Sequence, residues 1–174
     1  MLYLFIIMRI LGIDPGIART GWGLIDKTKN TVVPVAFDCI ETKSFMSVPQ
    51  RLLLIHQKIS SLLLEYEPDA MAIEELFFNT NAKTAFVVGQ ARGVILLSAA
   101  QQNKPIFIYT PLQVKIAVAG YGRAEKEQVG KMVKQLLGLD AIPRPDDTAD
   151  ALAIAITHAV SFRKETDLLI ASKS

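Results

Sequence analysis

Two patterns of hydrophobic and polar residues divide the chain into strands and helices. Apolar, β-branched runs occupy residues 9–14, 21–26 and 31–41, and the polar segment 27–30 separates the second run from the third. Short runs bounded by turn residues predict strands, and two strands joined by a short polar segment predict a hairpin. The chain is therefore predicted to begin with three antiparallel strands.

Helical spacing begins at Val48. Apolar residues recur three or four positions apart from Val48 to Tyr66, and the pattern ends just before Pro68, where a helix normally stops. The short apolar run 70–75 then predicts a buried strand. Because crossover connections between parallel strands are right-handed, we expect this strand to lie parallel to the first one and beside it.

A long helix is predicted from the capping candidates 79–81 to about Gln102. Its middle is apolar on nearly every face, at residues 85–88 and 94–97, and such a helix is covered on two sides. We expect its own sheet to cover one side and a second subunit to cover the other. The remaining elements are one strand and three helices, at residues 105–109, 111–118, 124–137 and 147–162.

This order of elements predicts one α/β domain over residues 1–174, with a mixed five-stranded sheet flanked by helices. A hydrophobic content of 51% supplies ample core for such a domain. Met8 stands just before the first strand, so residues 1–7 are interpreted as an N-terminal extension from an upstream start. The polar tail 164–174 is interpreted as a frayed end.

Composition and charge bear on the cellular compartment of the protein and on the partners that it can bind. A single cysteine, Cys39, cannot form an internal disulfide, and the apolar segment 1–7 is far too short to cross a bilayer. Both observations favour a cytoplasmic protein with no membrane partner. The net charge is only +2, so binding to nucleic acid would depend on where the basic residues lie rather than on their number.

Asp14 is a single carboxylate at the end of an otherwise buried strand. Burying a carboxylate is costly unless a cation or hydrogen-bond donors compensate it. Two readings stay open at this point: an aspartate anchored by turn amides, or a metal ligand or catalytic carboxylate. Gly16, Gly21 and Gly23 permit a tight reversal and are expected to let DNA and the hairpin approach closely.

Three more acidic residues stand where they could join Asp14. Glu74 lies near the end of the strand predicted beside the first one, and Asp147 and Asp150 share one face at the start of the last helix. Aspartates at a helix N-terminus also act as caps, and Asp146 is placed to be the N-cap. Buried carboxylates in contact raise each other's pKa, whereas a divalent cation between them would remove the conflict.

The four carboxylates together form an oxygen-only donor set. Hard oxygen ligands suit Mg2+, with Mn2+ as a substitute, rather than zinc. Such a set fits phosphodiester hydrolysis with two ions per subunit, one activating water and the other stabilising the leaving oxygen. The residues predicted to be catalytic and metal-binding are Asp14, Glu74, Asp147 and Asp150.

Several motifs resemble the RuvC family of Holliday junction resolvases, in order and at compatible spacing over residues 8–163. They are Ile10-Leu11-Gly12-Ile13-Asp14-Pro15-Gly16, Thr20-Gly21-Trp22-Gly23, Ala72-Ile73-Glu74, Gly89-Gln90-Ala91-Arg92-Gly93, Gln113-Val114-Lys115, Ala124-Glu125-Lys126 and Asp147-Thr148-Ala149-Asp150-Ala151-Leu152-Ala153-Ile154-Ala155.

The resemblance implies a ribonuclease-H-like fold, a homodimer and Mg2+ dependence. It also implies paired symmetric nicks across a four-way DNA junction during homologous recombination and DNA repair, alongside the RuvA–RuvB branch-migration complex. The same four acidic residues correspond to the metal ligands of the family. The position of Asp147 is a histidine in some members, so ligand identity is least fixed there.

DNA contacts are predicted near the acidic residues. The resemblance favours Phe77, rather than Phe78, as the aromatic residue that stacks on an unpaired base. Basic residues on loops and helix starts at the same edge of the sheet are candidates for phosphate contacts, and the family motifs favour Lys115 and Lys126. The full set of basic candidates is Lys83, Arg92, Lys115, Arg123 and Lys126.

Three alternative functions share part of this pattern. An acidic strand followed by a glycine-rich hairpin also resembles the phosphate motif of sugar kinases and actin-like ATPases, but those proteins need two such domains, for which 174 residues are too few. A non-catalytic DNA-binding module would not be expected to retain four carboxylates. A ribonuclease H or a transposase-type nuclease would share the acidic site and differ only in local motifs.

Overall fold

The computed structural model describes residues 7–76 and 82–162. All the predicted strands and helices are present, with bounds close to those expected. In chain order they are β1 (Met8–Asp14), β2 (Arg19–Lys27), β3 (Val32–Glu41), α1 (Val48–Tyr66), β4 (Ala70–Glu74), α2 (Ala82–Gln101), β5 (Ile106–Tyr109), α3 (Pro111–Ala119), α4 (Lys126–Leu136) and α5 (Asp146–Ser161).

Some predictions fall outside these residues. The helix caps 79–81, the tail 164–174 and all but the last residue of the extension 1–7 are not described, so these assignments stay predictions. The extent of the domain, 1–174, likewise stays a prediction. Within the part of the chain that is described, no helix is long and apolar enough to span a membrane.

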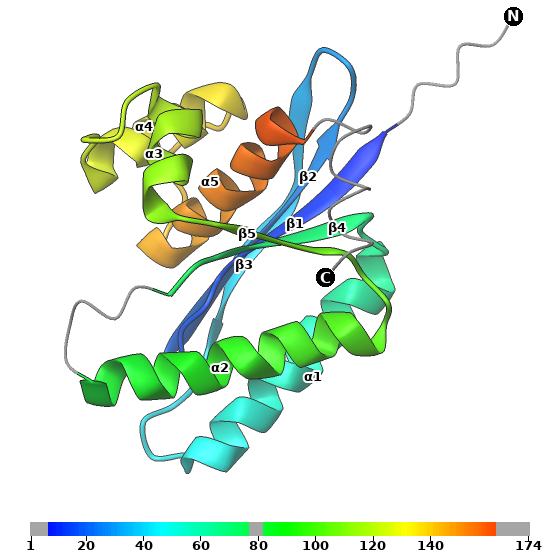
Figure 1. The fold of residues 1–174 in the computed structure, drawn as a ribbon, viewed down its shortest axis with the longest axis vertical. Helices are drawn as coiled ribbons and strands as arrows, with labels where there is room; N and C mark the ends of the chain where they lie inside the picture. Colours follow the sequence, from blue (N-terminus) through cyan, green and yellow to red (C-terminus); the bar gives the residue numbers. More distant parts are fainter. Residues whose placement is uncertain (1–6, 77–81, 163–174) are drawn as a thin grey trace, which may run out of the picture.

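The five strands form one mixed sheet in the order β3-β2-β1-β4-β5. β2 pairs antiparallel with both β1 and β3, and β4 pairs parallel with both β1 and β5. The predicted opening hairpins are confirmed, as is the place of the crossover strand beside the first strand. Because β1, β4 and β5 are parallel, their carboxyl ends reach the same edge of the sheet (Figure 1).

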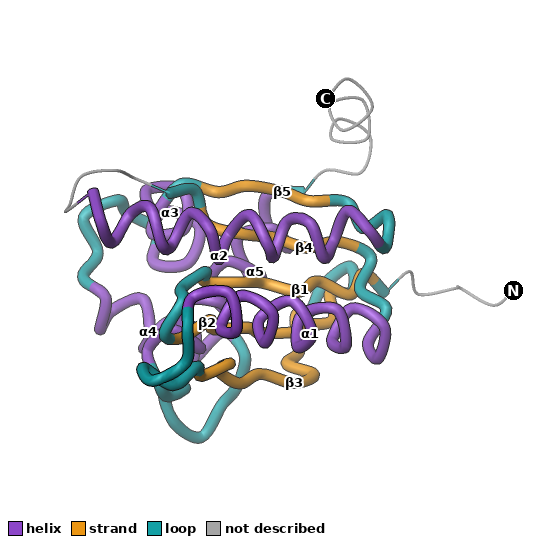
Figure 2. The backbone as a smooth tube through the Cα atoms, turned by 90° about the horizontal axis from the view of Figure 1, so that it is seen from below, coloured by secondary structure: helices purple, strands orange, loops and turns teal. Residues whose placement is uncertain are grey.

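Helices cover both faces of the sheet. α1 and α2 lie on one face and α3, α4 and α5 on the other, with the strands between the two helix layers in Figure 1. Figure 2 looks from below onto the face that α1 and α2 cover. Side chains of β1 alternate between the two layers: Ile10 belongs to the core under α5, whereas Leu11 and Ile13 belong to the core under α1 and α2. By this alternation Asp14 faces the α5 side.

Glycines on β1 and β2 bring α5 unusually close to the sheet. A Cβ atom on Gly12 would meet the carbonyl oxygen of Ala151, and one on Gly21 would meet the carbonyl oxygen of Asp147. A Cβ atom on Gly23 would likewise meet the side chain of Leu152. The expectation that Gly21 and Gly23 admit DNA is therefore wrong, because the last helix of the chain already fills that space.

Candidate active site

Asp14 and Glu74 end neighbouring parallel strands. β1 and β4 are paired up to Ile13 and Ile73, so the next residues, Asp14 and Glu74, lie side by side at the sheet edge. Both side chains are half-buried, whereas Glu75 is exposed. The predicted meeting of the two carboxylates is confirmed, and Glu74 raises the pKa of Asp14 through its charge.

Asp147 and Asp150 come from the beginning of α5. The N-cap of this helix is Pro145, and Asp146 is its first helical residue. The expectation that Asp146 caps the helix is wrong, because helical backbone begins one residue earlier than the sequence pattern indicated. Asp147 and Asp150 nevertheless project toward the strand ends, since each raises the pKa of Asp14 through its charge.

Burial and repulsion from neighbouring carboxylates raise the pKa of Asp14, Glu74 and Asp150. Burial is the largest cause at Asp14, whose pKa is raised further by the other acidic residues of the cluster. Burial is also the largest cause at Glu74 and Asp150. The ionised cluster is therefore destabilised, and a positive charge among these groups would lower its free energy.

Two basic side chains of the chain itself reach this cluster. Lys126 Nζ lies 2.8 Å from Asp150 Oδ2. Arg19 Nη1 lies 3.7 Å from Asp147 Oδ2, and Arg19 Nε lies 3.9 Å from Glu41 Oε1. The sequence predicts Lys126 as a phosphate contact but does not predict its ion pair with Asp150. It does not predict Arg19 as a site residue.

Arg19 could have been found from strand pairing. Asp14 pairs with Gly21 in the antiparallel register of β1 and β2, so the start of β2 lies beside the end of β1. Arg19, two residues before Gly21, is therefore held close to the acidic residues at the end of β1. In the sequence alone, Arg19 is only a polar residue in the turn after the first strand.

Arg92 contacts the backbone of Glu74. Its Nε donates to the backbone carbonyl oxygen of Glu74 at 3.4 Å, and its side chain is half-buried. This bond ties α2 to the end of β4. The predicted contact of Arg92 with DNA phosphate stays a prediction.

The structure describes the side chains of two of the remaining predicted DNA contacts. Lys115 is half-buried on α3, and Arg123 is exposed between α3 and α4. Phe77 and Phe78 lie outside the described residues, as does the side chain of Lys83. Their contacts with DNA also stay predictions.

A divalent cation suits the donor set of the cluster, which consists of carboxylate oxygens alone. Within residues 7–76 and 82–162, no three acidic, histidine or cysteine side chains are already arranged as a ready-made metal site. Lys126 and Arg19 instead engage Asp150 and Asp147. A cation that enters the cluster would therefore compete with these two basic side chains for carboxylate oxygens.

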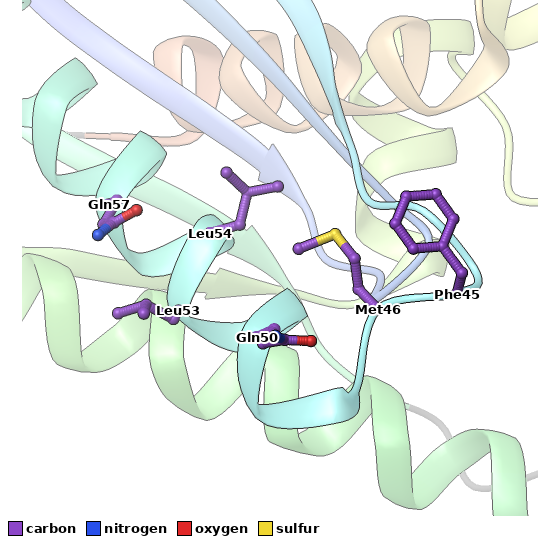
Figure 3. Close-up of a pocket in the computed structure, with 6 residues that line it drawn as sticks. All are labelled: Phe45, Met46, Gln50, Leu53, Leu54 and Gln57. Carbon is purple, nitrogen blue, oxygen red and sulfur yellow. The ribbon is translucent and has the colours of Figure 1, made fainter.

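An apolar concavity of about 470 Å3 lies between the loop after β3 and the first turns of α1 (Figure 3). No carboxylate lines it, so it does not form part of the candidate active site. Its lining residues are Phe45, Met46, Gln50, Leu53, Leu54 and Gln57.

The family model described as "Crossover junction endodeoxyribonuclease RuvC" matches residues 10–158 of this chain. The chain belongs to the RuvC family. A relative from Desulfitobacterium hafniense with the same description is 58% identical over 154 residues, which are 88% of this chain and 93% of the relative. A RuvC from Alkaliphilus oremlandii is 57% identical over 87% of this chain and 93% of its own.

Solved RuvC structures share the fold as well. Thermus thermophilus RuvC in complex with a Holliday junction substrate is 40% identical, with a TM-score of 0.83 over 87% of this chain and 93% of that one. The yeast mitochondrial Holliday junction resolvase Ydc2 is 18% identical, with a TM-score of 0.65, and shows the fold alone. The predicted ribonuclease-H-like α/β fold is confirmed.

Proposed function

We propose that this chain is a metal-dependent endonuclease that resolves four-way Holliday junctions by paired symmetric nicks. The observation that carries the proposal is the convergence of four carboxylates at one sheet edge, in a chain of the RuvC family. The complex of Thermus thermophilus RuvC with a Holliday junction supports junction DNA as the substrate. We also propose that the enzyme acts in the cytoplasm with RuvA–RuvB during recombination and repair.

Four residues would hold the metal in this proposal: Asp14, Glu74, Asp147 and Asp150. Mg2+ is the proposed cofactor, with Mn2+ as a substitute and two ions per subunit. When bound, the ions supply Lewis acidity at the attacking water and at the leaving oxygen. Lys126 and Arg19 reduce the net negative charge that a DNA phosphate meets at this edge.

We expect a labelled four-way junction to be nicked symmetrically by the protein in Mg2+, with no nicking of linear duplex or of an RNA–DNA hybrid. Addition of a chelator should stop the reaction, since the carboxylates by themselves supply no Lewis acid. Products are resolved on a denaturing gel. Cleavage of the hybrid instead of the junction would indicate a ribonuclease H, and no cleavage of any substrate in Mg2+ or Mn2+ would refute the proposal.

The surface of α2 supports a homodimer. Ala91, Ile95 and Ala99 face the core, yet the opposite side of the helix is also apolar. There Phe86 and Leu97 are 67% and 54% exposed. A second copy packed against this stripe would bury both side chains, and an isologous pair would present two identical sites to the two symmetry-related strands of a junction.

The dimer proposal predicts that Leu97→Glu converts the protein to a monomer, because a carboxylate in a packed apolar contact is costly. Sedimentation velocity measures the change. Leu64→Glu is the matched control, since Leu64 is 69% exposed on α1. If Leu97→Glu sediments as the unmodified protein does, the contact does not run through this face of α2.

A further inference from the structure

The β1–β2 turn, residues 15–18, joins two residues of the acidic site. Asp14 precedes the turn, and Arg19, which lies beside Asp147, follows it. A Cβ atom on Gly16 would collide with the carbonyl oxygen of Arg19, so the turn closes tightly. The position of this turn therefore sets where a central carboxylate and a neighbouring cation stand.

Two buried threonines hold the turn through three consecutive carbonyl groups. Thr20 Oγ1 donates to the carbonyl oxygen of Gly16 at 2.6 Å. Thr42 donates twice: its Oγ1 to the carbonyl oxygen of Ile17 at 2.6 Å, and its backbone N–H to that of Ala18 at 3.0 Å. Thr42 follows the end of β3, so the turn is held by a residue 25 positions away in the chain.

Arg51, in the first turn of α1, makes a hydrogen bond to Thr42. Its Nε donates to Thr42 Oγ1 at 2.6 Å. Because Thr42 Oγ1 accepts this bond, its own proton is directed to Ile17, and a charged donor strengthens the second bond by polarising the hydroxyl. The result is a chain of hydrogen bonds from Arg51 through Thr42 to the turn after Asp14.

Arg51 has no acidic partner within the described residues, because none of the ion pairs there includes it. The charged groups that shift the pKa of Asp14 are the other acidic residues and Lys126, and Arg51 is not among them. The connection from Arg51 to the site runs through its hydrogen bond to Thr42.

We propose that Thr42 and Arg51 are positioning residues for the active site, acting through the β1–β2 turn. The inference rests on the proposed nuclease function. Without the Thr42 hydroxyl the carbonyl of Ile17 loses its donor, and the turn gains freedom that displaces Asp14 and Arg19. Misplacement of a reacting group by about 1 Å costs up to about 100-fold in rate, so even a partial shift has a measurable effect.

The test compares Thr42→Val, which preserves side-chain shape, with Thr42→Ser, which preserves the hydroxyl. We expect Thr42→Val to lower kcat on a four-way junction by about 10-fold with little change in KM, and Thr42→Ser to retain kcat. We also expect faster backbone amide exchange at residues 15–19 in Thr42→Val without metal or DNA. Both enzymes are assayed well below their melting temperatures.

Two further variants separate positioning from stability. Arg51→Met, which removes only the donor behind Thr42, should lower kcat in the same direction, with Arg51→Lys closer to the original enzyme. Thr28→Val is the matched control, because Thr28 makes its hydrogen bonds at the β2–β3 hairpin, at the other end of β2. Thr28→Val should at most lower the stability of the fold and should leave kcat unchanged.

Different outcomes would refute the positioning role of Thr42 and Arg51 and the proposed nuclease function. If the unmodified protein cleaves junctions and both Thr42→Val and Arg51→Met cleave with the same kcat, the positioning role is wrong and the nuclease function stands. If Thr42→Val fails to fold, Arg51→Met decides alone. If the unmodified protein cleaves no junction, the proposed function itself fails, whatever the amide exchange shows.

Discussion

Asp14→Asn is expected to abolish junction cleavage while junction binding persists. Asp14 is the carboxylate on which the charges of all three other acidic residues act, so the amide removes the central ligand of the proposed metal site. Loss of one preorganised electrostatic group in an active site typically costs about 100-fold to 1,000-fold in kcat, and we expect at least the upper figure. Single-turnover cleavage and gel mobility of the same junction measure the two properties separately.

The same substitution is expected to stabilise the protein in chelator. The pKa of Asp14 is raised well above its ordinary value of 3.8, so the folded state binds this proton more tightly than the unfolded state does. The contribution of Asp14 to stability is thus fully present below pH 3.8 and is lost as the pH rises through the folded-state pKa. At neutral pH an uncharged amide avoids this loss.

We expect Asp14→Asn to raise the metal-free melting temperature at pH 7 by about 2–4 °C, which corresponds to about 1 kcal/mol for a domain of this size. The gain should shrink as the pH is lowered toward 4. Asp140→Asn is the control, because Asp140 is exposed between α4 and α5. A variant that cleaves junctions normally, or that melts below the original protein in chelator, would contradict the assignment of Asp14.

Gly21→Ala is expected to disable the enzyme without touching a carboxylate. The added Cβ atom would overlap the carbonyl oxygen of Asp147, so the start of α5 must move away from β2. Overpacking of this kind typically costs about 1–3 kcal/mol, or roughly 2–12 °C in melting temperature. Because Asp147 and Asp150 move with the helix, we expect kcat to fall about 100-fold even where the protein is folded.

Gly89→Ala provides the matched control on α2. A Cβ atom there meets only Leu76 Cδ1, at 3.9 Å, which is an ordinary contact. Alanine in a helix is intrinsically better than glycine by about 1 kcal/mol, so this variant should melt at the same temperature or higher. Equal activity and stability of Gly21→Ala and the original protein would show that the close approach of α5 is not required.

Much of the fold could be predicted because each element depends on a local pattern. The helix predicted from Val48 to Tyr66 has those bounds in the structure, since apolar spacing and the following proline are both sequence features. The strand at 70–75 was placed correctly beside β1 because crossover handedness leaves few choices. The start of α5 was misplaced by one residue, because Pro145 supplies the cap geometry without a capping side chain.

The sequence by itself determined which residues are proposed to carry the chemistry. A carboxylate at the end of a buried strand, as at Asp14, needs a compensating partner wherever the strand lies. The further acidic positions at Glu74, Asp147 and Asp150 could be recognised from strand and helix periodicity. The proposal of a hard cation followed from the oxygen atoms of the predicted ligands alone.

Only the tertiary structure decided what surrounds those residues. The glycines proved to admit α5 rather than DNA, because the side of the strand on which a helix packs depends on contacts far apart in the chain. Arg19, Lys126 and Arg92 reach the cluster or its backbone from three separate elements. Ion pairs and hydrogen bonds of this kind depend on distances of a few ångströms between segments, which no local pattern encodes.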